Sequence, residues 1–192
     1  MVCYFVILFL SYQVRLKIRR SWVDDISHWR SGAGFIGSHT ALLLLNENND
    51  IVIIDNFINS DPEIKKRLER LSNRSVQVYD FDVQNEVELE KLFVKYEFEA
   101  VIYFAGLKAV GESVEKPLVY YENNIVSTLT LLQVMERHGV TNFVFSSSAT
   151  VYRFPKEVPI KENAVLYATN PYGRTKLIIE EILHDICVSN SN

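Results

Sequence analysis

The chain has 192 residues, of which 48% are hydrophobic and 23% charged, and its formal net charge is -4. This composition is ordinary for one globular domain with a sizeable core. It does not favour nucleic-acid binding, which uses clustered basic residues, and its two distant cysteines exclude a disulfide-rich scaffold. Four scattered histidines show no metal-ligand spacing. We therefore expect no nucleic-acid partner, no metal and a reducing, cytoplasmic location.

The first 30 residues form an unusual leader. Residues 1–10 are almost all apolar, and a basic segment follows from Arg15 to Arg20. The apolar run is shorter than the roughly 20 residues that a membrane-spanning helix needs, and a signal peptide would carry its basic residues before the apolar ones. We predict that residues 1–30 stand outside the fold that occupies residues 31–192, with no membrane association. A targeting segment remains the alternative.

Short apolar runs alternate with amphipathic segments from residue 31 onwards. The runs that predict strands are residues 51–55, 76–82, 100–105 and 142–146. The segments that predict helices are residues 37–46, 62–71, 86–96, 117–138 and a last one that opens at Asn170-Pro171. Nearly continuous apolar strands are typical of a parallel sheet covered on both faces. The pattern predicts an α/β fold with a Rossmann-like, doubly wound parallel sheet.

Residues 32–37 (GAGFIG) form a glycine-rich turn of the G-x-G-x-x-G type. Such a turn lets the backbone approach a pyrophosphate and aims helix N–H groups at it. A strand that ends in Asp55 follows at the spacing where an acid accepts hydrogen bonds from the adenosine ribose. The motif predicts dinucleotide binding. The alternative for Asp55 is a solvated turn with Asn56.

The segment that precedes the glycine turn does not fit this motif. The fingerprint normally follows a buried strand directly, but residues 24–31 contain two acids, a histidine and an arginine. Burying such unpaired charges is costly. The apolar run near the N-terminus is too far away for a tight turn. We therefore expect the central first strand to be missing or replaced, and we expect poor solubility if its neighbours are left unpaired.

Tyr172 and Lys176 form a Y-x-x-x-K pair on the last predicted helix. Residues four apart on a helix share a face, and a neighbouring ammonium favours the phenolate, which makes tyrosine a usable general base. The row Ser146-Ser147-Ser148 follows a predicted strand, at the sheet edge where α/β folds bind ligands. A serine hydroxyl there would bond a substrate hydroxyl and the phenol. The glycine turn, acid, serine row and Y-x-x-x-K pair together predict a site of the short-chain-dehydrogenase type.

Five segments carry a family resemblance: SGAGFIGSHT (31–40), IDNFINS (54–60), FAGLKAVGESVEKPLVYYENN (104–124), FVFSSSATVY (143–152) and NPYGRTKLIIE (170–180). From residue 31 to its end the chain resembles the UDP-glucose 4-epimerases, NAD-dependent enzymes of the extended short-chain dehydrogenase family. The resemblance implies interconversion of UDP-glucose and UDP-galactose in galactose metabolism. It also implies transient hydride transfer from sugar C4 to tightly bound NAD, a UDP-sugar substrate and a homodimer.

The resemblance implies a role for each matching residue. Tyr172 would remove the proton of the sugar 4-hydroxyl, Lys176 would tune that tyrosine and hold the nicotinamide ribose, and Ser148 would assist. The other implied cofactor residues are Gly34, Phe35, Ile36 and Gly37 at the pyrophosphate, Asp55, Asn56, Asn59 and Ser60 at the adenosine, Asp82 and Val83 at the adenine, and Phe104, Ala105, Gly106, Lys108 and Asn124 along the channel. Lys108 as a solvated loop charge and Asn124 as an ordinary polar helix residue are the alternatives.

Some features depart from the family pattern. Ser31 and Arg153 stand where the family has glycines, and the family continues beyond the Y-x-x-x-K helix with a further strand and a substrate domain. The alternatives are therefore a truncated or inactive family fragment, or another NAD-dependent nucleotide-sugar enzyme such as a dehydratase. Dehydratases typically carry a Thr-Asp-Glu segment where this chain has Ser-Ser-Ala-Thr, which favours the epimerase.

Overall fold

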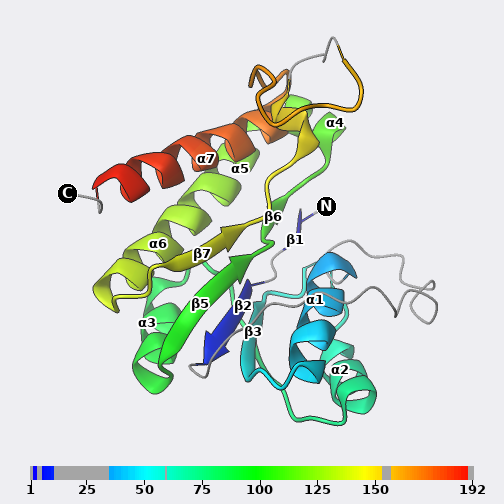
Figure 1. Cartoon of the computed structure of the whole chain (residues 1–192), viewed down its shortest axis with the longest axis vertical. Coiled ribbons are helices and arrows are strands. Elements are labelled where there is room, and N and C mark those ends of the chain that lie inside the picture. Colours follow the sequence, from blue (N-terminus) through cyan, green and yellow to red (C-terminus); the bar gives the residue numbers. More distant parts are fainter. Residues whose placement is uncertain (1, 4–5, 11–34, 59, 153–156, 190–192) are drawn as a thin grey trace.

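The computed structural model describes residues 2–3, 6–10, 35–58, 60–152 and 157–189, and Figure 1 shows a central sheet with helices on both faces. Within these residues the main sheet has five strands in the order β4-β3-β2-β5-β7. They are β2 (Val6–Leu10), β3 (Ile51–Asp55), β4 (Gln77–Asp80), β5 (Phe98–Tyr103) and β7 (Asn142–Phe145). The pairs β3–β4 and β5–β7 are parallel. The predicted Rossmann-like α/β class is confirmed.

The sheet separates two hydrophobic cores. On one face lie α1 (Phe35–Asn46) and α2 (Ile64–Ser72), and on the other lie α3 (Glu86–Lys95), α6 (Ser127–Arg137) and α7 (Pro171–Ser189) (Figure 1). Side chains of β3 alternate between the cores: Ile51 and Ile53 pack with the α1–α2 side, while Val52 and Ile54 pack with the α3–α6 side. This alternation explains the unbroken apolar run, because both faces of the strand are buried.

The central strand comes from the N-terminal apolar run. β2 lies between β3 and β5 and is antiparallel to both, with Val6 opposite Ile54 and Tyr103. A doubly wound sheet has a parallel strand in this place. The predicted replacement of the first strand is therefore confirmed, and the replacement runs in the reverse direction. Both neighbours have a ladder partner, so the unpaired edges expected from the sequence are not present in the middle of the described sheet.

A second short pair involves the same N-terminal segment. β1 (Val2–Cys3) is antiparallel to β6 (Gly106–Leu107), with Cys3 opposite Gly106. The expectation that residues 1–30 stand outside the fold is wrong for residues 2–3 and 6–10, because both segments pair with strands of that fold. The boundary between residues 30 and 31 itself lies outside the described residues and stays a prediction. The N-terminal residues thus contribute backbone pairing to the described fold through both β1 and β2.

The segment predicted as one helix over residues 117–138 is interrupted. It consists of α5 (Pro117–Tyr121), a wide π-helical turn η1 (Glu122–Val126) and α6. A short helix α4 (Val110–Glu115), which the sequence did not predict, precedes it. Gly139, the residue after the C-cap His138 of α6, has a φ of 69°, the left-handed conformation in which a glycine commonly ends a helix. Single π turns inside helices are frequent at functional sites.

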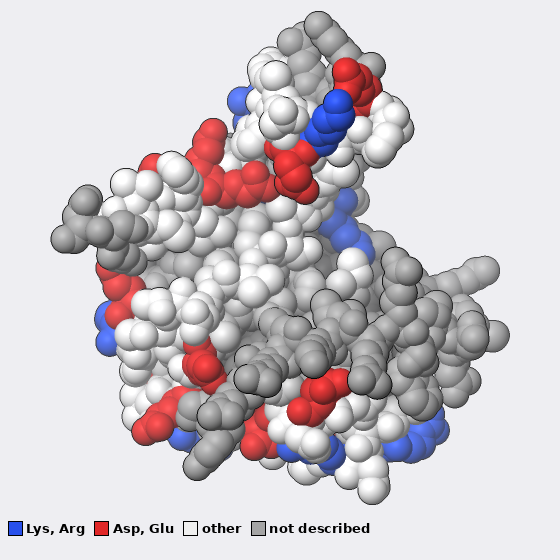
Figure 2. Space-filling view, viewed as in Figure 1, with Lys and Arg blue, Asp and Glu red and all other residues white. Residues whose placement is uncertain are grey.

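Charged side chains are scattered over the described surface. On the face that Figure 2 shows, Lys and Arg lie in small, separate groups between larger numbers of Asp and Glu. Among the described helices, none combines the length and the apolar character that crossing a membrane requires.

Candidate functional site

The predicted site residues gather at one edge of the sheet. β3 and β5 are both antiparallel to β2, and each is parallel to its outer neighbour, so the carboxyl ends of β3, β4, β5 and β7 lie together. Asp55, Asp82, Gly106 and Ser148 all follow or end these strands. The beginning of α7 reaches the same edge. Open α/β sheets bind ligands in this position.

Asp55 is the most deeply buried acid of the site, with 1% of its surface exposed. Its Oδ1 accepts hydrogen bonds from the N–H of Phe57 at 2.8 Å and from Ser60 Oγ at 2.7 Å. Its Oδ2 is buried without a hydrogen-bond partner among the described residues. Burial is the main cause that raises the pKa of Asp55 from 3.8 to about 6. Buried acceptors are normally satisfied, so Oδ2 marks a place for a donor from a ligand.

Asn56 connects the ends of β3 and β4. Its Nδ2 donates to Asp82 Oδ2 at 3.1 Å, and Asp82 Oδ1 accepts from the N–H of Gln84 at 2.8 Å. Val83 is fully buried and packs in the core beneath. The structure therefore brings together Asp55, Asn56 and Asp82, three of the residues assigned to the adenosine side. Because the side chain of Val83 is buried in the core, only its backbone could contact the adenine.

The glycine turn lies partly outside the described residues. Gly34 and Asn59 are among the residues that the structure does not describe, so their predicted roles stay predictions. Phe35 begins α1, Ile36 is 61% exposed and Gly37 is buried in the first turn. A helix that begins directly after the second glycine agrees with the predicted pyrophosphate turn.

The serine row forms the turn after β7. The N–H of Ser146 donates to Tyr103 O at 3.1 Å and so extends the ladder with β5 by one bond. Ser148 begins a short 3-10 turn, η2 (Ala149–Val151). Its Oγ accepts from the N–H and from the Oγ1 of Thr150, at 3.2 and 3.0 Å. With both lone pairs engaged, the Ser148 hydroxyl keeps its own proton to donate.

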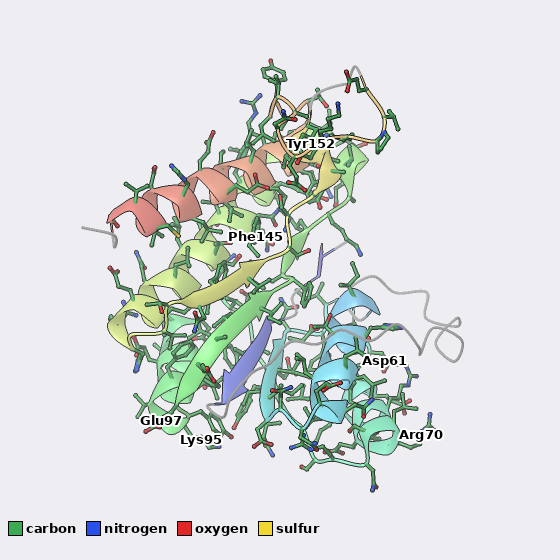
Figure 3. The ribbon with its side chains drawn as sticks, viewed as in Figure 1. Asp61, Arg70, Lys95, Glu97, Phe145 and Tyr152 are labelled. Atoms are coloured by element: carbon green, nitrogen blue, oxygen red, sulfur yellow. The ribbon has the colours of Figure 1, made fainter. Side chains whose placement is uncertain are left out.

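α7 brings Tyr172 and Lys176 to this turn. Lys176 is 5% exposed, and its Nζ donates to Ser146 O at 2.9 Å and lies 4.6 Å from the ring centre of Phe145. In Figure 3, Phe145 lies on β7 and Tyr152 lies near the start of α7. A carbonyl oxygen and an aromatic face both stabilise a buried ammonium. Tyr172, half-buried, lies one helical turn before Lys176.

The start of α7 follows from its sequence. Asn170 Oδ1 accepts a hydrogen bond from the N–H of Gly173 at 2.8 Å, and Pro171 is the first helical residue. Asparagine at the N-cap and proline at the first position are the preferred residues there. The predicted helix start is confirmed, and it fixes where Tyr172 lies along the sheet edge.

Residues after β5 line the middle of the edge. Ala105 and Gly106 are buried, Phe104 is half-buried and Lys108 is exposed. Gly106 has a φ of 133°, a conformation that other residues rarely adopt. A Cβ at Gly106 would lie 3.0 Å from Asn124 Oδ1, so glycine allows this close approach.

The side-chain amide of Asn124 makes its hydrogen bonds with other residues of the protein. Its Oδ1 accepts from the N–H of Leu107 at 2.7 Å, and its Nδ2 donates to Leu107 O and to Thr175 Oγ1, both at 3.0 Å. It therefore ties the π turn η1 to β6 and α7. The contact with a cofactor that the sequence assigned to Asn124 stays a prediction.

The neighbouring Asn123, which the sequence did not single out, holds a second buried acceptor. Its Oδ1 is buried and has no hydrogen-bond partner among the described residues. It is the second such acceptor, besides Asp55 Oδ2, in the part of the chain that the structure describes. The sequence signal was the pair Asn123-Asn124, but it did not distinguish the bonded residue from the unbonded one.

A buried tyrosine supports the start of α7 from below. Tyr120 is fully buried, and its hydroxyl donates to Glu112 Oε2 at 3.0 Å and accepts from the N–H of Ala109 at 3.1 Å. Burial and the bond to Glu112 raise the pKa of Tyr120 to about 12, and Tyr172 contributes weakly. Tyr120 therefore stays protonated, and α5, which carries it, contacts α7.

Comparison with known proteins gives consistent results. The model of the GDP-mannose 4,6 dehydratase family matches residues 31–190. UDP-glucose 4-epimerase 2 of Arabidopsis thaliana is 54% identical over 163 residues, which are 83% of this chain and 47% of that protein. UDP-glucose 4-epimerase of Bacillus subtilis is 50% identical over 155 residues, or 81% of this chain and 46% of that protein. The chain thus spans about half the length of these relatives.

A solved structure agrees in fold and sequence. UDP-glucose 4-epimerase from Bifidobacterium longum, in complex with NAD+ and UDP, superposes with a TM-score of 0.80 at 50% identity and covers 82% of this chain and 48% of that one. The family match includes the glycine turn, the serine row and the Y-x-x-x-K pair. The chain therefore belongs to the GDP-mannose 4,6 dehydratase family, and it is similar to UDP-glucose 4-epimerases over about four fifths of its length.

Proposed function

We propose that this chain supplies the NAD-binding part and the catalytic base of a nucleotide-sugar 4-epimerase that interconverts UDP-glucose and UDP-galactose. The observation that carries the proposal is the position of Lys176. This residue is buried on α7, the helix that also carries Tyr172, and its Nζ donates to Ser146 O after β7. The similarity to UDP-glucose 4-epimerases over four fifths of the chain supports the same activity. The substrate would be the UDP-linked sugar.

The residues of the sheet edge fit NAD. Asp55 Oδ2, which is buried and has no partner among the described residues, needs donors, which the adenosine ribose hydroxyls would supply. The N-terminal N–H groups of α1 would bind the pyrophosphate. The Bifidobacterium longum relative was crystallised with NAD+ bound. When bound, NAD would supply a reversible hydride acceptor for sugar C4.

The chain's own residues would move the proton. Tyr172 would accept the proton of the sugar 4-hydroxyl, and the Lys176 ammonium one turn away would stabilise the phenolate. Ser148 would donate its hydroxyl proton toward the sugar oxygen, because both of its lone pairs are occupied by Thr150. The bond to Ser146 O would hold the buried ammonium at the end of β7, one helical turn from Tyr172 along α7.

A dehydratase is the alternative that the family name raises. Dehydration removes a sugar hydroxyl as water, and this step needs an acid close to the leaving oxygen. The turn after Ser148 offers Ala149 and Thr150, neither of which is an acid. The epimerase therefore fits the site better. An NAD-binding module without turnover is a further alternative, because the chain spans only about half of its relatives' length.

The predicted homodimer and the cytoplasmic location stay predictions. α5 exposes Leu118 by 80% and Val119 by 50% of their surfaces. Such an apolar helical face supports contact with a second copy of the chain through this helix.

Turnover of UDP-galactose by the purified NAD-loaded protein tests the proposal, with UDP-glucose as the measured product. Tyr172→Phe removes the base, and we expect a loss of kcat of about 10²- to 10⁴-fold with NAD still bound. Tyr167→Phe, on the half-exposed loop before α7, is the matched control and leaves kcat unchanged. NAD retention without turnover in the parent protein would indicate the module, and full turnover by Tyr172→Phe would contradict the proposal.

A further inference from the structure

α7 holds the serine row at two successive helical turns. Lys176 Nζ donates to Ser146 O at 2.9 Å, and Ser147 Oγ donates to Glu180 Oε1. Residues 176 and 180 are four apart, so they project from the same side of the helix. Two consecutive residues of the row are thereby attached to two consecutive turns of α7. Lys176 already has a role in the proposed reaction, whereas Glu180 has none.

Ser147 is the link between the sheet and the catalytic turn. The N–H of Ser146 still bonds to Tyr103 O in the β5 ladder, and Ser148 already caps η2 through the N–H of Thr150. Ser147 therefore stands between two fixed structures, and its conformation sets the direction in which η2 leaves the sheet. Its hydroxyl bonds to a carboxylate, and such charge-assisted bonds are about twice as strong as neutral ones.

The bond lies in a sheltered place. Glu180 and Ser147 are both half-buried, and Ile179, next to Glu180 on α7, is only 1% exposed. By contrast, Glu181, the following residue of the helix, is exposed. Two adjacent glutamates on one helix thus differ in what they face: one meets the serine row and the other meets solvent. A sheltered bond is screened less by solvent than a surface contact.

We propose that Glu180 is a positioning residue, which acts through Ser147 to hold the Ser148 hydroxyl at the correct distance from Tyr172. This inference rests on the proposed epimerase function. Ser148 itself touches neither Lys176 nor Glu180 in the contacts of the described residues; its Oγ bonds to Thr150. Its place relative to α7 therefore depends on the two bonds made by Ser146 and Ser147. A misplacement of about 1 Å in a catalytic group can lower the rate by about 10²-fold.

Four variants of the NAD-loaded protein test this role: Glu180→Ala, Glu180→Gln, Ser147→Ala and the double variant Ser147→Ala/Glu180→Ala. We expect Glu180→Ala and Ser147→Ala to lower kcat for UDP-galactose about 10- to 100-fold each, with KM and NAD affinity unchanged. The double variant should lose no more than either single one, because both remove the same bond. Glu180→Gln should recover most of the rate, since its amide oxygen still accepts from Ser147.

Glu181→Ala is the matched control and should keep the parent kcat. Three results would each overturn the positioning role: a parent-like kcat in Glu180→Ala, additive losses in the double variant, or no recovery in Glu180→Gln. If the parent protein turns over UDP-galactose, none of these results contradicts the proposed epimerase function. A parent protein that does not turn over would instead overturn the proposed function, and this role with it. If Glu180→Ala does not fold, Ser147→Ala decides the matter, because it removes the same bond by deleting a single hydroxyl.

Discussion

Asp55 shows how a residue that is built to meet a ligand can lower the stability of the protein on its own. A turn at the end of β3 satisfies one carboxylate oxygen through Phe57 and Ser60, and the other oxygen is buried without a partner. Burial disfavours the charged form and raises the pKa to about 6. The unfolded chain releases this proton at lower pH than the folded one. The charged carboxylate therefore destabilises the ligand-free fold at neutral pH and becomes useful only when donors arrive.

Asp55→Asn should make the ligand-free protein more stable at neutral pH. Because the folded-state pKa is higher than the ordinary value of 3.8, Asp55 lowers stability as the pH rises through about 6, and the variant avoids a cost of roughly 1–3 kcal/mol. Below about pH 4 the acid is protonated in both states, and the difference should vanish. Urea unfolding of parent and variant across this pH range measures it, with the exposed Asp185→Asn as the control.

The same variant should bind NAD more weakly than the parent, although it is the more stable protein without NAD. Ribose hydroxyls that donate to Asp55 favour its charged form, so NAD affinity of the parent should rise as the pH rises through about 6. The affinity of Asp55→Asn should be weaker and almost independent of pH in this range. A titration that shows equal pH dependence for the two proteins would mean that Asp55 does not meet NAD.

At the level of single residues, the sequence predicted those positions that depend on the spacing of residues along one strand or helix. Asp55 and the pair Tyr172–Lys176 were found because strand ends and helical turns fix their positions. The sequence could not show that Asn124 is hydrogen-bonded to β6 and α7 while Asn123 Oδ1 has no partner among the described residues, because both residues lie in the wide π turn, whose geometry differs from that of a regular helix. Nothing in the residue pattern of 117–138 marks that wide turn.

At the level of elements, the close approach of α7 to η2 shapes the site. A Cβ on Gly173 would lie 2.6 Å from the backbone oxygen of Thr150 and 3.0 Å from its Oγ1. Only glycine permits this approach, because the obstructing atom is backbone and cannot rotate away. The contact puts Tyr172, the preceding residue, within reach of the turn that carries Ser148.

Gly173→Ala should therefore push the two elements apart. We expect it to lower the free energy of unfolding by about 1–3 kcal/mol, the usual cost of overpacking, and to lower kcat. Gly111→Ala in α4 is the matched control: its Cβ would meet nothing within 4 Å, so the better helix former should stabilise by about 0.5–1 kcal/mol. Urea unfolding of both variants measures the difference. If both variants changed the free energy of unfolding by the same amount, the close approach of α7 to η2 would not require glycine at position 173.

The elements themselves were predictable to different degrees. β3 has the predicted bounds, because a continuous apolar run buried on both faces leaves little choice of ends. The edge strand β4 is shorter than predicted, since only one side of it has a ladder partner in the described sheet. The need for glycine at position 173 was not predictable. The obstructing Thr150 belongs to another element, and sequence periodicity reports on one element at a time.

At the scale of the whole molecule, the reversed β2 is the main departure from a doubly wound sheet. The sequence correctly predicted that the first strand is missing or replaced, because charged residues precede the glycine turn. It did not predict the replacement's direction. Hydrophobic pattern carries no direction, and an apolar strand can pair antiparallel as readily as parallel with the same neighbours.

Deleting residues 1–10 should abolish cooperative unfolding of the described domain. β2 pairs along its length with both β3 and β5, so its loss would leave two unpaired ladders in the middle of the sheet and uncover the face of α1 that it contacts. Deleting residues 1–3 removes only β1, whose pairing with β6 spans two residues, and should leave a sharp transition. Thermal unfolding followed by circular dichroism distinguishes the two. A sharp, parent-like transition after deletion of residues 1–10 would mean that the sheet closes without this strand, because β3 and β5 would then have to pair directly.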